Sequence, residues 1–359
     1  MNGEYIMDIL NVAHRSGSYD ILIDSNTIPA LKDYLAETYK GKKAAIITDD
    51  VVGPLYEKMV LSVITDSGLS CNSMYIKHGE ESKSMSTLEQ VYDWLCSLGM
   101  TRTDIIIALG GGVVGDLAGF AASTFMRGVP FINIPTSLLA QVDSSIGGKV
   151  AVNLPSGKNL VGTFYPPKAV FICTDFLKTL ENRYLHDGLA EVIKYGCIKD
   201  SSIISTLSQV ACRDDLMLNI REIILRCLSI KKDLVEKDEL DTGCRMLLNF
   251  GHTIGHGIEK HYNYSRYTHG EAVGLGMVWI TQKSEELGLT KPGTAREICR
   301  MLDKFSLPSD IDKTIRDSII KTISHDKKAA GNSIHMVLLK EIGEGFIKEI
   351  SMRDIWKYV

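Results

Sequence analysis

The sequence predicts an α/β protein of two domains, with a mostly parallel sheet in the first half and mainly helices in the second. Three observations predict this. The chain has 359 residues, which is long for one domain. Its first half alternates short β-branched runs with amphipathic helical stretches, the pattern of a parallel sheet covered by helices. After about Thr174, apolar residues recur at three- and four-residue spacing. The predicted domains are therefore 1–174 and 175–359.

Six short runs are the candidate strands of the sheet. They are YDILID (19–24), KAAIITDD (43–50), NSMYIKHG (72–79), DIIIALGG (104–111), FINIPTS (131–137) and VFICTD (170–175). Helix-like segments such as SMSTLEQVYDWLCSLG lie between them. In such sheets, ligands bind beyond the carboxyl ends of the strands. We therefore expect binding residues at Asp49, 78–83, 110–116 and 136–137.

The second half is predicted to contain five helices and one hairpin. The helical segments are 182–199, 214–236, 243–262, 271–287 and 310–324. A hairpin-like pair, SIHMVLLKEIG and GFIKEIS, follows near the end. The sequence shows neither an internal repeat nor a low-complexity linker.

The composition is that of an ordinary soluble protein, with 45% hydrophobic and 23% charged residues. A net charge of −4 argues against general affinity for nucleic acids or membrane surfaces, although a local cationic pocket could still bind a small anion. The first residues lack the pattern of a signal peptide, and the most apolar stretches are too short to span a bilayer. Eight singly scattered cysteines are typical of reduced thiols. We therefore expect a cytoplasmic protein.

The run GGGVVG at 110–115 matches G-x-G-x-x-G between a predicted strand and a helix, as in a dinucleotide-binding turn. Glycines let the backbone approach a pyrophosphate, and the helix end favours the anion. The motif lies on about the fourth strand, however, and the next strand ends in hydroxyls instead of a ribose-binding acid. Asp49 could supply that acid from another strand. A plain tight turn is the alternative, but Asp116 in the same loop and the polar HGEESKS run favour a Rossmann-like cofactor domain.

The run NFGHTIGH at 249–256 places His252 and His256 one helical turn apart. Zinc peptidases use this spacing in H-E-x-x-H, but Thr253 stands where their general base would be. From spacing alone, the two histidines could be a metal pair, one ligand with one bystander, or ordinary helix residues.

Catalytic zinc sites usually have three protein ligands, often two histidines and a carboxylate, and they leave one position open. His269 lies in YTHGEAV at the start of the next predicted helix. Asp187 and Glu191 lie one turn apart in HDGLAEVIKYG and are the candidate carboxylates. The neighbours of Glu191 are Ala190 and Val192, which give no sign of an exposed charged face.

Five runs together resemble 3-dehydroquinate synthases: GGGVVGD, PTSLLAQVDSSIGGKVAVNLPSGKNLVGTFYPP, DGLAEVIKYG, LLNFGHTIGHGIE and THGEAVGLGM. The similarity is dense over about residues 43–280, and the long middle run is the most specific. The resemblance implies that Glu191, His252 and His269 bind a metal, most often zinc, with cobalt as the alternative. His256 would then be a polar substrate contact or proton carrier.

The resemblance also implies an NAD+ site, a substrate site and a homodimer. The implied NAD+ contacts are Asp49, Glu80, Lys83, Gly112, Val113, Val114, Gly115, Asp116, Thr136, Ser137, Lys149, Lys158 and Thr179. The implied catalytic and substrate contacts are Arg127, Asp143, Lys149, Asn159, Lys194, Lys231, Arg245, Asn249 and His256. Arg127 resembles a residue that reaches the phosphate pocket of a neighbouring subunit. Either Lys327 or Lys328 would supply a further phosphate-binding cation.

The implied reaction converts 3-deoxy-D-arabino-heptulosonate 7-phosphate into 3-dehydroquinate and phosphate, a step of the shikimate pathway. It proceeds by NAD-mediated transient oxidation, β-elimination of phosphate, re-reduction and intramolecular aldol closure, so the enzyme is a lyase by outcome. A substrate with both a carboxylate and a phosphate requires several cations, and arginine suits bidentate capture of the carboxylate.

Three alternatives compete with this interpretation. Another sugar-phosphate cyclase, of the 2-deoxy-scyllo-inosose or valiolone type, would bind a substrate without a carboxylate, so Lys149, Lys231, Arg245 and Asn249 should differ. A polyol dehydrogenase of the glycerol dehydrogenase type would release NADH. A catalytically inactive binding protein is disfavoured because no candidate metal ligand is missing.

The proposed carboxylate-binding pair imposes a structural requirement. Lys231 and Arg245 are 14 positions apart, which on an unbroken helix is about four turns and too far to meet on one anion. The stretch EKDELDTG between them must therefore bend or break.

Overall fold

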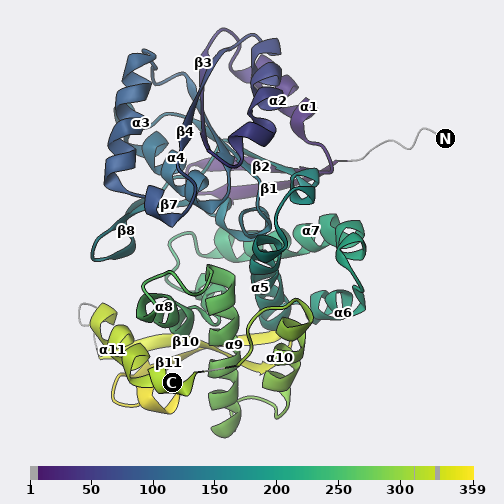
Figure 1. The fold of residues 1–359 in the computed structure, drawn as a ribbon, viewed down its shortest axis with the longest axis vertical. Coiled ribbons are helices and arrows are strands. Elements are labelled where there is room, and N and C mark those ends of the chain that lie inside the picture. The colour runs from purple at the N-terminus through teal and green to yellow at the C-terminus, as the bar shows by residue number, and fades with distance from the viewer. Residues whose placement is uncertain (1–6, 311, 328–331) are drawn as a thin grey trace, which may run out of the picture. The chain divides into compact units, whose positions relative to one another are not determined.

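The computed structural model describes residues 7–310, 312–327 and 332–359, in two compact units. One unit ends at Leu180 and the other begins at Glu181, a few residues beyond the predicted boundary (Figure 1). The predicted fold class is confirmed, since a mostly parallel sheet precedes a mainly helical unit. No helix in the described ranges combines the length and the apolar character needed to cross a membrane.

The first unit contains a seven-stranded sheet in the order β1-β2-β9-β6-β5-β3-β4. Its strands are β1 (Asp8–His14), β2 (Gly17–Asp24), β3 (Lys43–Asp49), β4 (Ser70–Ile76), β5 (Ile105–Gly110), β6 (Phe131–Pro135) and β9 (Ala169–Cys173). The six predicted strands form the parallel part. β1 pairs antiparallel with β2 at one edge and is not evident from the sequence pattern.

The central strands are buried on both faces because helices cover both sides of the sheet. Alternate residues of β3 point to opposite faces. Ala44 and Ile46 share a core with α1 (Ile28–Thr38) and α2 (Gly53–Asp66). Ala45 and Ile47 share another core with α3 (Met85–Ser97) and α4 (Gly112–Thr124). This alternation fixes the register of the sheet.

The strand order places the glycine loop at a topological switch point. After β3 the chain adds β4 on one side, and it then crosses to the other side of β3 to form β5. In open α/β sheets, ligands bind where the order reverses in this way, beyond the carboxyl ends of the strands. Asp49 ends β3 and Gly110 ends β5, so both predicted cofactor elements lie at this point.

The long run that carries most of the family resemblance forms several short elements. Ala140–Ser144 is one π-helical turn, and β7 (Lys149–Leu154) pairs antiparallel with β8 (Gly157–Phe164). The short helices η1 (Glu80–Ser82), η2 (Phe125–Arg127) and η4 (Thr174–Lys178) complete the unit.

The second unit consists of helices and one hairpin. The helices are α5 (Asn182–Ile198), α6 (Ser201–Gln209), α7 (Arg213–Lys237), α8 (His252–His261), α9 (His269–Glu286), α10 (Thr294–Lys304) and α11 (Arg316–Lys327), with short turns η5 (Cys244–Asn249), η6 (Lys313–Ile315) and η7 (Ile355–Lys357). The predicted hairpin is β10 (Ser333–Glu341) with β11 (Glu344–Ser351). The sequence pattern does not reveal α6 and α10.

Two helix predictions require correction. The predicted helix 243–262 is two elements, η5 and α8, because the chain breaks at Phe250 and Gly251, and Gly251 has a left-handed φ of 78°. The predicted helix 310–324 begins only after η6, at Arg316. The predicted break between Lys231 and Arg245 is confirmed, since α7 ends at Lys237 and η5 begins at Cys244.

Helices α8 and α9 approach each other so closely that only glycine fits at the contact. A Cβ on Gly276 of α9 would lie 2.1 Å from the carbonyl oxygen of Gly251. A Cβ on Gly255 of α8 would lie 3.1 Å from the carbonyl oxygen of Ala272. The close packing of these helices therefore depends on glycine, which has no side chain, at these positions.

We predict that Gly276→Ala lowers the free energy of unfolding by about 1–3 kcal/mol, because its methyl group overpacks a contact between backbones. Gly274→Ala on the same helix is the matched control. Its Cβ meets only the flexible end of Leu302, and alanine favours the helix, so the change should stay within about 1 kcal/mol. Urea unfolding of both variants makes the comparison. Equal stability of the two would contradict the close-packing argument.

Candidate active site

Three helices of the second unit bring one carboxylate and two imidazoles together. Glu191 lies on α5, whereas His252 and His269 are the first residues of α8 and α9. Oε1 of Glu191 is 3.5 Å from Nε2 of His252 and 3.6 Å from Nε2 of His269. One ligand atom from each residue lies within 4.8 Å of the others.

This geometry fits a tetrahedral divalent cation. Ligands about 2.1 Å from a tetrahedral ion are separated by about 3.4 Å, close to the separations between Glu191 Oε1 and the two Nε2 atoms. Glu191 is fully buried, and its oxygens face the ammonium group of Lys194 and the two imidazoles. A buried carboxylate that faces two imidazole nitrogens as well as a cation is the environment expected of a metal ligand.

The two imidazoles have opposite electrostatic environments. Burial and the nearby Lys194, His269 and His256 hold the pKa of His252 well below its ordinary value. Nδ1 of His252 lies 3.0 Å from the Phe250 carbonyl, and donation of its N–H there leaves Nε2 as the free lone pair. Burial also opposes a charged His269, but Glu191 and Glu259 outweigh it and raise its pKa to about 10. The protein charges thus favour a positive charge beside Glu191.

Lys194 and His256 border the same group. Lys194 is fully buried one turn after Glu191 and forms an ion pair with its Oε2. The exposed ring of His256 lies 5.6 Å from the ring of His252 and 6.0 Å from that of His269. His256, Glu259 and His269 also form a second three-donor group. The distances between these donor atoms therefore also allow His256 as a ligand.

Asp187, the other candidate carboxylate, has a different role. Its Oδ1 accepts a hydrogen bond of 2.6 Å from the backbone N–H of Gly270, at the start of α9. A Cβ on Gly270 would lie 2.1 Å from the Asp187 carbonyl oxygen. Burial raises the pKa of Asp187. Asp187 thus joins α5 to α9 immediately beside His269, while Glu191 faces the histidines.

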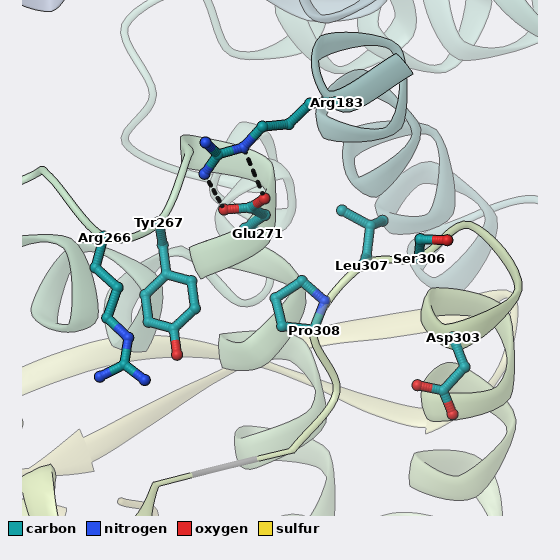
Figure 2. A pocket seen from close by; sticks show the side chains of 8 residues that line it. All are labelled: Arg183, Arg266, Tyr267, Glu271, Asp303, Ser306, Leu307 and Pro308. Atoms are coloured by element: carbon teal, nitrogen blue, oxygen red, sulfur yellow. Dashed lines mark hydrogen bonds and ion pairs between the residues drawn. The ribbon is translucent and has the colours of Figure 1, made fainter.

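A surface pocket of about 510 Å³ lies beside this junction (Figure 2). None of the sequence-predicted site residues lines it. Figure 2 shows Arg183 of α5 paired with Glu271 of α9, with N–O distances of 3.2 and 3.1 Å. Glu271 also accepts the backbone N–H of Thr268 at 2.8 Å. The ion pair between Arg183 and Glu271 thus fixes the start of α9, and its two charges neutralise each other.

In the first unit, a polar network joins several predicted cofactor residues. Lys83 is 4% exposed, forms an ion pair with Asp116 on α4, and donates to Oδ1 of Asn159 at 2.5 Å. Asn153 donates to Glu80 at 2.7 Å and accepts the backbone N–H of Asn159 at 2.8 Å. Asn153 was not among the sequence candidates. Its place within the family-like middle run is the signal that could have identified it.

The glycine loop packs against the turn after β6. A Cβ on Gly111 would approach Oγ of Ser137, and one on Gly112 would lie 3.0 Å from Oγ of Ser144. The backbone N–H of Thr136 donates to the Gly110 carbonyl at 3.0 Å. The loop, with Val113, Val114 and Gly115 in the first turn of α4, therefore lies beside Thr136 and Ser137.

Other predicted residues of the first unit are placed individually. Asp49 accepts the backbone N–H groups of Val51 and Val52 at 2.9 and 2.7 Å, before α2. Thr179 is hydrogen-bonded to Tyr56. Asp143 lies in the π-helical turn, Lys149 begins β7, Lys158 lies in β8, and Arg127 ends η2 with a φ of 66°.

The bend after α7 positions the predicted carboxylate-binding cations. Lys231 and Arg245 are 4% and 2% exposed. Oδ2 of Asp238 accepts the backbone N–H groups of Gly243 and Arg245 at 2.6 and 3.0 Å, and Arg245 donates to the Glu239 carbonyl at 2.7 Å. Glu239 and its neighbours thus lie in a turn and not on a helix. The exposed Asn249 ends η5.

Lys327 is the last residue of α11, and Lys328 lies outside the described residues.

Comparison with known proteins identifies the family. The model of the 3-dehydroquinate synthase N-terminal region matches residues 73–187, and the C-terminal model matches residues 188–329. The chain is also 47% identical over 353 residues to the 3-dehydroquinate synthase of Clostridium acetobutylicum, covering 98% of this chain and 99% of the relative. The chain belongs to the 3-dehydroquinate synthase family. The predicted function and enzyme class, those of a 3-dehydroquinate synthase, are confirmed.

Solved structures of sugar-phosphate cyclases share the fold of this 3-dehydroquinate synthase family member. A 2-deoxy-scyllo-inosose synthase, complexed with carbaglucose-6-phosphate, NAD+ and Co2+, has a TM-score of 0.84 at 25% identity and covers 98% of each chain. A 2-epi-5-epi-valiolone synthase from Streptomyces hygroscopicus, with NAD+ and Zn2+ bound, has a TM-score of 0.85 at 26% identity and covers 96% of each chain.

We predict that Glu191→Ala, His252→Ala and His269→Ala each lose bound divalent metal, because a three-ligand site has no spare donor. His256→Ala should retain one equivalent of metal and lose turnover. Metal analysis of the purified variants after gel filtration tests this, with the thermal midpoint as a control for folding. Equal metal loss from His256→Ala would show that this ligand set is wrong.

Proposed function

We propose that the 3-dehydroquinate synthase reaction uses NAD+ bound by the first unit, with a divalent metal and the substrate bound by the second. The convergence of Glu191, His252 and His269 beside the buried Lys194 carries this proposal, because these groups form an open two-histidine, one-carboxylate site. The substrate is 3-deoxy-D-arabino-heptulosonate 7-phosphate, and the products are 3-dehydroquinate and phosphate. Zinc is the expected metal, with cobalt as the alternative.

For NAD+, the proposed contacts are the glycine loop and the polar groups around it. The backbone N–H groups at the start of α4 bind the pyrophosphate, since Gly111 provides no side-chain cap there. Asp49, at the end of the neighbouring strand β3, accepts hydrogen bonds from the ribose hydroxyls. Lys83 and Asp116 hold the β7–β8 hairpin against the loop through Asn159. Glu80, Thr136, Ser137, Lys149, Lys158 and Thr179 complete the proposed set.

NAD+, when bound, would supply reversible hydride acceptance, and the metal would supply Lewis acidity toward a substrate hydroxyl. The chain's own side chains orient the substrate and move protons. Glu191, His252 and His269 would hold the metal. His256 is exposed beside both ligand histidines, so it can accept or donate a proton there. Lys194 and Asn249 bind further polar groups of the substrate.

The anionic ends of the substrate are assigned to cations and polar side chains. Arg245 and Lys231 bind the carboxylate, and burial strengthens these charge-assisted contacts. Either Lys327 or Lys328 supplies a further cation for the phosphate, and Lys149, Asn159 and Asp143 are further substrate contacts. Arg127 is exposed on a strained turn, which supports a role on a neighbouring subunit of a homodimer. We also propose a cytoplasmic location, since all eight cysteines are free thiols.

The other cyclases are the remaining alternative class because they share the fold. Sequence identity favours a 3-dehydroquinate synthase over these classes. The chain is 47% identical to a 3-dehydroquinate synthase, but 25% and 26% identical to the inosose and valiolone synthases. Lys149, Lys231, Arg245 and Asn249, which should differ in those enzymes, are all present.

We predict that steady turnover of the heptulosonate phosphate releases phosphate without accumulating NADH beyond one equivalent per active site. The physical reason is that the hydride leaves and returns to the same substrate. Simultaneous recording of NADH absorbance and phosphate release tests this, and a chelator should stop the phosphate release. Continuous NADH production in step with product would instead identify a dehydrogenase.

We predict that Arg245→Met weakens substrate binding by about 1.5–3 kcal/mol, or about ten- to a hundredfold, because it removes a charge-assisted contact. NAD+ affinity should hardly change. Substrate and NAD+ titrations measure both quantities, and the exposed Arg266→Met is the control arginine. Normal binding of the heptulosonate phosphate by Arg245→Met would restore the carboxylate-free cyclases as the leading alternative.

A further inference from the structure

A buried carboxylate lies on the far side of His269 from the proposed metal. Glu259, one helical turn after His256 on α8, is 3% exposed. Its Oε2 is 3.6 Å from Nδ1 of His269, while Nε2 of the same ring is 3.6 Å from Oε1 of Glu191. The imidazole of His269 therefore lies between two buried carboxylates, one facing each ring nitrogen.

An imidazole that binds a metal through one nitrogen carries a proton on the other, and that N–H needs an acceptor. A carboxylate in this position fixes the tautomer and the ring orientation and makes the metal-binding nitrogen more basic. His252 already has such an acceptor, since its Nδ1 lies 3.0 Å from the Phe250 carbonyl. Glu259 is the acceptor that faces the corresponding atom of His269.

We propose that Glu259 is a positioning residue that holds the Nδ1–H of His269 and thereby presents Nε2 to the metal. The inference rests on the proposed metal site. Glu259 acts through His269 and does not itself touch the metal or the substrate. Its burial supports this role, because a carboxylate removed from water requires a donor or cation facing it.

One rival assignment uses the same atoms differently. His256, Glu259 and His269 lie close enough to form a second metal site, in which Glu259 would be a ligand. Such a site would need Nδ1 of His269 as a lone pair, whereas the positioning role needs it as a donor. The number of bound ions therefore separates the two assignments.

The test compares Glu259→Gln with the unaltered protein. The amide keeps the shape of the side chain but removes the charge that orients the N–H. We expect both proteins to bind one metal ion, with the affinity for Zn2+ about 10–100-fold weaker in the variant when measured by competition with a chelator. The visible spectrum of the Co2+-loaded variant should keep the wild-type band positions, because the three ligands are unchanged. Glu259→Asp should recover part of the affinity.

Glu285→Gln is the matched control. Glu285 also accepts a hydrogen bond, from the backbone N–H of Ala295 at 2.7 Å, and it lies on α9 like His269. It is 16 residues, or about 24 Å, farther along that helix, so its loss should leave the metal affinity unchanged. Thermal unfolding without metal shows whether Glu259→Gln folds. If Glu259→Gln misfolds, ¹⁵N-imidazole spectra of the unaltered protein provide the test instead. In these spectra, His269 should carry its proton on Nδ1 when metal is bound.

Three results would overturn the proposal. Unchanged metal affinity in a folded Glu259→Gln would show that the carboxylate has no role at His269. A fall from two bound ions to one would make Glu259 a ligand of a second site. A proton on Nε2 of His269 with metal bound would reverse the assignment of the ring nitrogens. Absence of any bound metal in the unaltered protein would instead contradict the proposed function itself.

Discussion

Close backbone contact between α5, α8 and α9 is the constraint on which the second unit depends. The donor atoms of Glu191, His252 and His269 lie within 4.8 Å of one another, although each comes from a different helix. At two contacts between these helices the backbones also approach more closely than a side chain would allow. Gly276 against Gly251 and Gly270 against Asp187 provide this approach. The two histidines that begin α8 and α9 are thereby held beside α5.

The same convergence concentrates buried charge where stability alone would not place it. Glu191 and Lys194 are both fully buried. Removing two opposite charges from water often costs as much free energy as their attraction returns, so such a pair is weak evidence for stability. A cation that binds only the folded protein would offset this cost by mass action. The buried pair is therefore better explained by binding than by folding.

The sequence predicted the parallel sheet because its central strands are buried on both faces and stand out as apolar runs. It did not reveal β1, whose exposed residues alternate with partly buried ones at a sheet edge. Helical spacing also continued through Phe250 and Gly251, which hid the break before His252. Spacing alone could not choose between Asp187 and Glu191, one turn apart, because the choice depends on which helix faces which carboxylate. Glu259 was missed for the same reason.

Substrate choice in this fold rests on particular side chains, since inosose and valiolone synthases share the architecture. In the proposed site, the carboxylate-binding cations depend on the turn that follows α7. Burial disfavours the charge of Asp238, but hydrogen bonds from the backbone N–H groups of Thr242, Gly243 and Arg245 outweigh it and lower its pKa. The carboxylate therefore stays ionised at neutral pH and keeps the chain off the helical path. This turn and the Glu239 carbonyl direct Arg245, so in the proposed site the binding of the carboxylate depends on Asp238, which acts through the turn.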